Sequence, residues 1–121
     1  MYHGILLNKS FKDNTFLLTY KSFSTKVFEN SDWIVYGIEI NDKEIENQIK
    51  LIQKNMIRGK YFNHVYNDER LVIIYKDKIF DVTSHISSWK NAIEYGKSLG
   101  IDEDQLNFWP NRFQDEVHYF N

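Results

Sequence analysis

The chain contains no cysteine, one proline and only five glycines among its 121 residues. Without cysteine it can form neither a disulfide framework nor a thiolate metal site, and this favours a reducing compartment. The scattered glycines form no phosphate-binding pattern. The longest apolar run, residues 71–75, is far shorter than the roughly 20 residues of a membrane helix. The N-terminus lacks the basic start and apolar run of a signal peptide. We therefore expect a cytoplasmic domain without cofactor, metal or membrane segment.

Charge is nearly balanced overall, with 15 basic and 17 acidic side chains, but it is unevenly distributed. Residues 1–28 hold four lysines against one aspartate, whereas residues 102–121 hold five carboxylates against Arg112. Such ends can attract each other within one chain or between two copies, although solvated surface is the simpler interpretation. A net-acidic domain argues against nucleic acid as a partner, because phosphate binding needs a basic surface.

Aromatic residues, in contrast, are abundant: Phe, Tyr and Trp make up 17% of the chain. Their large side chains dominate the energetics of cores and interfaces. Residues 1–121 have the length of one domain, which buries enough surface to fold without a metal or disulfide. We expect a dense aromatic core, with aromatic surface left over for a partner or ligand.

Alternating apolar residues predict six strands. Residues 3–11 and 15–23 flank the polar segment Lys12-Asp13-Asn14, which predicts a hairpin. Residues 33–40 are apolar on both faces near Trp33, which indicates a central strand. Polar turns separate three more strands, expected to form a meander: residues 61–66, 71–75 and 79–83.

Two helices interrupt this pattern. The first follows a capping box formed by Asn41 and Glu44. Its apolar stripe has helical spacing: Ile45, Ile49, Ile52 and Met56. Ser87 or Ser88 is expected to cap the second helix, and Gly100-Ile101 predicts a Schellman ending. The inward residues of that helix should be Trp89, Ala92, Ile93, Gly96 and Leu99.

The expected element order is therefore three strands and a helix, then three more strands and a second helix, and finally a tail. This order predicts an α+β fold: a largely antiparallel sheet of about six strands with two helices on one face. The alternative is a ferredoxin-like core that begins at Trp33, with the first hairpin as an addition.

A histidine among aromatic residues is the first candidate functional group. His64 shares one strand face with Phe62 and Tyr66, and histidine can act as a base near neutral pH. We predict a small-molecule pocket near it, formed by His64, Tyr61, Tyr66 and Asp81. The alternative is a half-buried sheet residue whose ring is satisfied by a neighbour.

The C-terminal segment is the second candidate, because it is rich in aromatic residues around an arginine. Phe108, Trp109, Arg112 and Phe113 have the composition of a binding hot spot. They could bind a protein partner or a second copy of the chain in a homodimer, or fold back and seal the open end of the sheet. Either way we expect an ordered tail.

Other chemistry has weaker support. Glu116 and His118 would point the same way in an extended tail and, with His3 or Asp81, could form a weak metal site. A solvated tail is the simpler interpretation. No nucleophile motif is present. Aromatic residues and lysines alternate in the N-terminal hairpin, which would suit single-stranded nucleic acid.

Three functions thus remain open. The first is a non-enzymatic module that binds a protein or self-associates. The second is a small-molecule-binding domain or enzyme with a pocket near His64. The third is a binder of single-stranded nucleic acid.

Overall fold

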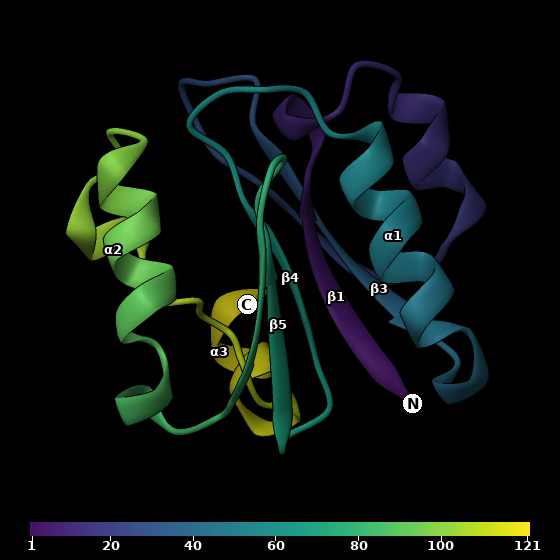
Figure 1. Cartoon of the computed structure of the whole chain (residues 1–121). Coiled ribbons are helices and arrows are strands. Elements are labelled where there is room, and N and C mark those ends of the chain that lie inside the picture. The colour runs from purple at the N-terminus through teal and green to yellow at the C-terminus, as the bar shows by residue number, and fades with distance from the viewer.

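Six strands form one antiparallel sheet in the computed structural model, which describes residues 1–121 (Figure 1). The strand order across the sheet is β2-β3-β1-β4-β5-β6. The strands are β1 (Tyr2–Leu7), β2 (Lys21–Val27), β3 (Ile34–Ile40), β4 (Asn63–Tyr66), β5 (Arg70–Ile74) and β6 (Ile79–Thr83). The predicted α+β class with a six-stranded antiparallel sheet is confirmed.

Three α-helices and six short 3₁₀ helices complete the chain. The α-helices are α1 (Ile45–Asn55), α2 (Lys90–Ser98) and α3 (Glu116–Tyr119). The 3₁₀ helices are η1 (Asn8–Ser10), η2 (Asn14–Thr19), η3 (Asp42–Glu44), η4 (Ile86–Ser88), η5 (Glu103–Gln105) and η6 (Phe113–Asp115). None of the helices has the length and apolar character needed to cross a membrane.

The helix α1 forms where the sequence predicts it. The Asn41 side chain accepts a hydrogen bond from the Lys43 amide at 3.1 Å and so caps η3, which leads directly into α1. The predicted apolar stripe is buried, from Ile45 at 5% exposure to Ile52 at 0%. Burial of such a stripe, rather than helix propensity, supplies most of a short helix's stability.

The helix α2 ends as predicted but begins differently. The amide of Ile101 donates to the Gly96 carbonyl at 3.1 Å and that of Gly100 to Lys97 at 3.0 Å, which is the Schellman pattern. Gly100 has φ +90°, a left-handed conformation that suits glycine. The predicted serine cap is wrong: the hydroxyl of Ser88 donates to the His85 carbonyl within η4 instead.

The two longer helices cover opposite faces of the sheet, so the expectation that both lie on one face is wrong (Figure 1). The stripe of α1 packs against alternate strand residues such as Leu6 and Val72. Trp89 and the residues of α2 pack on the other face, with Ile5 and Leu71. The strand β5 is buried on both faces, and a sheet of that kind needs a cover on each.

The predicted N-terminal hairpin is also wrong. The strand β1 ends at Leu7, residues 14–19 form η2, and β2 pairs with β3 rather than with β1. Phe11 and Leu17 join the core beneath α1. The strand β1 lies between β3 and β4, at the centre of the sheet. This placement rules out the ferredoxin-like alternative, in which these first residues would be an addition.

The C-terminal tail docks on the same face as α2 (Figure 1). A Cβ on Gly37 would lie only 2.6 Å from the Phe23 ring and 2.9 Å from the Phe120 ring, so the missing side chain gives both rings room on β3. The Lys26 ammonium donates to the Tyr119 carbonyl at 3.0 Å. The N-terminal part and the tail therefore meet within one chain, and the tail packs on the sheet as expected.

Candidate ligand-binding pocket

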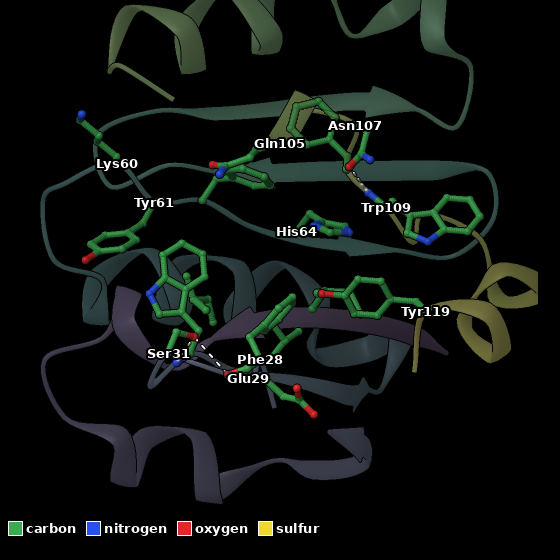
Figure 2. A pocket seen from close by; sticks show the side chains of 16 residues that line it. Phe28, Glu29, Ser31, Lys60, Tyr61, His64, Gln105, Asn107, Trp109 and Tyr119 are labelled. Carbon is green, nitrogen blue, oxygen red and sulfur yellow. Dashed lines mark hydrogen bonds between the residues drawn. The ribbon is translucent and has the colours of Figure 1, made fainter. Parts of the chain in front are cut away.

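A cavity of about 600 Å³ lies on the tail-covered face of the sheet. Its floor comes from Ile5 and Leu7 of β1, Val35 of β3 and His64 of β4. Its walls come from three other parts of the chain: residues 28–33, residues 60–62 and the tail. Seven aromatic side chains line it: Phe28, Trp33, Tyr61, Phe62, Phe108, Trp109 and Tyr119. Figure 2 shows His64 in the middle of this set, with Tyr61 to one side and Trp109 to the other.

The His64 ring is buried and held by the tail. Its exposure is 3%, and its Nε2 lies 2.7 Å from the Pro110 carbonyl oxygen. A carbonyl can only accept, so Nε2 carries a proton and donates. Burial lowers the pKa of His64 to about 4, although the Pro110 carbonyl opposes the shift. The imidazole is therefore neutral at physiological pH, and its Nδ1 is an unprotonated acceptor.

The Nδ1 atom of His64 is the ring nitrogen without a hydrogen-bond partner in the chain. The ring makes one hydrogen bond, through Nε2. No fully buried side-chain nitrogen or oxygen lacks a hydrogen-bond partner in this structure. Since Nδ1 has no such partner, it retains accessible surface, and His64 is one of the residues that line the cavity. The floor thus offers a hydrogen-bond acceptor among apolar rings.

A tight turn of the tail forms one wall. The Asn107 side chain accepts a hydrogen bond from the Trp109 amide at 3.2 Å. Between them Phe108 adopts φ +46°, a left-handed conformation that is uncommon for a bulky residue. Its ring is 1% exposed and packs edge-on against Phe62 and Trp89, with centroids 5.3 and 5.4 Å away. Core packing therefore holds this wall in place.

Charged groups occur only at the rim of the cavity. Lys60 and Glu29 line it, and neither forms an ion pair with another residue of the chain. Figure 2 shows both charged ends pointing away from His64. The Tyr119 hydroxyl is protonated, because burial raises its pKa to about 12. The interior of the cavity is consequently uncharged.

The structure brings together two of the four residues predicted for a pocket. His64 and Tyr61 both line the cavity. Tyr66 lies on the same face, with its ring centroid 5.7 Å from that of His64, but its hydroxyl donates to Glu116 outside the cavity. Asp81 lies on the opposite face of the sheet, where it forms a bidentate ion pair with Arg70.

Glu116 joins the tail to the sheet beside the cavity. Its Oε2 accepts a hydrogen bond from the Tyr66 hydroxyl at 2.5 Å and lies 2.7 Å from Nδ1 of His3. The His3 ring lies between Phe23 and Phe113, with centroids 4.3 and 4.6 Å away. Burial, followed by this carboxylate, raises the pKa of Tyr66, so its hydroxyl keeps the proton it donates.

The weak metal site considered for the tail does not form. Glu116 and His118 belong to the helix α3 rather than to an extended segment, and His118 is exposed. Glu116 does reach His3, but no group of three His, Asp or Glu side chains is placed to hold a metal ion.

The four tail residues predicted to bind a partner have different environments. Phe108 is buried, and Phe113 packs against His3 and Tyr66. Trp109 is 38% exposed and lines the cavity. Arg112 is half-exposed and pairs with Asp115 at 3.1 Å. Most of this aromatic surface is thus covered by the chain itself.

The N-terminal lysines do not form an open basic surface. Lys9 pairs with Asp32 and Lys21 with Glu39, which leaves Lys12 as the exposed lysine without an ion pair. Lys26 contacts the Tyr119 carbonyl and lies 4.4 Å from the centre of its ring. The aromatic residues between these lysines are buried or half-buried, so no row of stacking rings faces solvent. The hairpin proposed to bind single strands is absent.

The sequence did not single out the N-terminal half of the cavity. Ile5, Leu7 and Phe28 line it because β1 occupies the centre of the sheet. No pattern among residues close together in the sequence predicts that β1 lies at the centre of the sheet. The one available signal was Gly4-Ile5-Leu6-Leu7, a run that is apolar on both faces, as a central strand requires.

Comparison with known proteins provides no further constraint: no protein-family model, curated protein or solved structure matches this chain.

Proposed function

We propose that this protein binds a small, uncharged molecule that contains a ring, in the cavity above His64. The observation that carries the proposal is the cavity itself: about 600 Å³, lined by seven aromatic side chains, with one neutral imidazole on its floor. Small-molecule sites are typically concave and mostly apolar, measure about 300–1,000 Å³ and contain a few placed polar groups.

The lining supports a ring rather than a flexible chain. Aromatic side chains interact best with other rings, through stacked or edge-to-face contacts. The cavity interior offers no charge to pair with a charged ligand, and an unpaired charge is costly to bury. An uncharged, ring-containing molecule satisfies both conditions.

Binding is favoured over catalysis because of the partner that His64 has. A general base is most effective when its pKa lies near the operating pH, and a carboxylate beside the ring raises the pKa of a histidine toward that range. The Nε2 of His64 instead donates to the backbone carbonyl of Pro110, and burial lowers its pKa. Such a histidine serves as a hydrogen-bonding group.

The tail supports this proposal over a protein partner. Phe108 and Phe113 contribute to the chain's own core, which leaves Trp109 as the exposed ring of the group. Trp109 itself lines the cavity. Of the aromatic residues that suggested a docking surface, Phe108 and Trp109 therefore line the pocket, and Phe113 packs against His3 and Tyr66.

A fluorescent probe with a matched pair of variants tests the proposal. N-phenyl-1-naphthylamine is neutral, and its emission rises in apolar surroundings. Leu7→Trp would fill the cavity floor, whereas Leu18→Trp makes the same change at a side chain that is 77% exposed in η2 and lies outside the cavity. We expect saturable binding by the wild type and Leu18→Trp, and at least about tenfold weaker binding by Leu7→Trp.

Equal affinity in all three proteins, or no saturable binding by the wild type, would contradict the proposal. Unfolding curves of both variants show whether each is folded at the temperature used. If Leu7→Trp does not fold, Val35→Phe provides a second way to reduce the cavity volume.

A further inference from the structure

We infer that the ligand is a planar ring system that presents an N–H or O–H donor to Nδ1 of His64. This inference rests on the proposed function and names the chemistry of the molecule that the cavity would hold. Indole-like and phenol-like rings belong to this class.

The orientation of the imidazole is fixed from behind. The Pro110 carbonyl accepts the Nε2 proton at 2.7 Å, which selects one tautomer and leaves the Nδ1 lone pair free. The stacked ring of Tyr66, 5.7 Å away, limits tilting of the imidazole. The acceptor, Nδ1 of His64, is therefore held in place before a ligand binds. A ligand does not have to fix the orientation of the imidazole, and preorganised groups of this kind favour affinity.

The Nδ1 atom also selects against other ligands. A carboxylate, phosphate or carbonyl group would place its own lone pair against that of Nδ1. The ammonium group of Lys60 at the rim points away from His64 and would not compensate (Figure 2). A purely apolar ring would leave Nδ1 without a partner after water is displaced. An unsatisfied buried acceptor is costly, so an apolar ring should bind less well than a donor-bearing ring of the same shape.

Two near-isosteric probes separate these possibilities. Indole carries a ring N–H, whereas benzothiophene has sulfur in the same position and is more apolar. Area burial alone would favour benzothiophene. We expect the wild type to bind indole about tenfold more tightly than benzothiophene, measured by protein-observed NMR titration. In His64→Phe, which keeps a ring on the floor without an acceptor, that preference should disappear or reverse.

A second measurement uses only the wild-type chain and does not depend on how well His64→Phe folds. The ¹⁵N resonance of an unprotonated imidazole nitrogen moves upfield when it accepts a hydrogen bond. With indole bound, the Nδ1 resonance of His64 should therefore lie upfield of its position with benzothiophene bound, because benzothiophene displaces water without replacing its hydrogen bond.

The outcomes distinguish this inference from the proposed function. An equal or greater affinity of the wild type for benzothiophene overturns the inference, while binding of both rings still supports the pocket. An unchanged preference in His64→Phe, or the same Nδ1 resonance with indole bound as with benzothiophene bound, also overturns it. If neither ring nor N-phenyl-1-naphthylamine binds, the proposed function fails as well.

Discussion

The Nε2 atom of His64 lies 2.7 Å from the carbonyl oxygen of Pro110, and this hydrogen bond joins the centre of the sheet to the C-terminal tail. It spans 46 residues of sequence and satisfies a group that is 3% exposed. The same contact closes a wall of the cavity and determines which imidazole nitrogen is left to face it. This hydrogen bond therefore links the stability of the chain to the proposed ligand binding at one residue.

Stability should fall as the pH drops from about 6.5 toward 4. The pKa of His64 is about 4 in the folded chain, below its ordinary value of 6.5, so between these values the unfolded state binds a proton that the folded state does not. The resulting loss is at most about 3 kcal/mol.

Urea denaturation of the wild type and His64→Phe over this pH range measures the effect. Other titrating groups are common to both proteins, so the wild type should lose stability relative to the variant as the pH falls. A difference that does not change with pH would show that His64 is not buried in its neutral form.

Replacement of Trp89 by alanine should destabilise the chain strongly. The ring is 5% exposed, its Nε1 donates to the Thr83 carbonyl at 2.8 Å, and it supports Phe108 at the wall of the cavity. We expect a loss of about 3–5 kcal/mol. Trp33→Ala is the comparison, because its ring is 37% exposed and should cost clearly less. Similar denaturation midpoints for the two variants would contradict this assignment of the core.

The contact between Glu116 and Tyr66 should show coupling in a double-mutant cycle. Glu116→Ala leaves the Tyr66 hydroxyl without its acceptor and should cost about 1–3 kcal/mol. Once Tyr66→Phe has removed that hydroxyl, the same change at Glu116 should cost less, because only the contact with His3 is then lost. Strict additivity of the two free energies of unfolding would mean that this contact does not hold the tail.

The protein should have no significant affinity for single-stranded nucleic acid. The lysines at positions 9 and 21 are paired with carboxylates, and Lys26 contacts Tyr119. We expect no binding of a labelled DNA or RNA oligonucleotide tighter than about 100 µM at physiological salt. Fluorescence anisotropy that reveals micromolar affinity with a steep salt dependence would restore the N-terminal region as a binding surface.

Local patterns in the sequence were enough to predict much of this fold. The helix α1, the meander of β4 to β6 and the Schellman ending of α2 each depend on residues close together in the chain. The position of β1 does not, because it is determined by pairing with β3 and with the distant β4. The polar segment after Phe11 resembled a hairpin turn, yet Asp13 and Thr15 form the start of η2.

The candidate site was predictable to the same extent. His64 and Tyr61 lie near each other in sequence, and both line the cavity. Asp81 was misplaced because the register across the meander was unknown: His64 pairs with Ile73, which pairs with Phe80, so Asp81 points to the other face. The cavity walls formed by the N-terminal part and by the tail depend on packing between distant segments. The spacing of residues close together in the sequence does not predict such packing.

The most direct test of the central claim is to locate a bound ring by NMR, using chain labelled at the methyl groups of Ile, Leu and Val. If the cavity above His64 is the binding site, indole should show nuclear Overhauser effects to the methyls of Ile5, Leu7 and Val35, which form its floor. The exposed methyls of Leu18, Val27 and Ile86 serve as the internal control. Contacts confined to the control methyls, or contacts to no methyl group, would contradict the account.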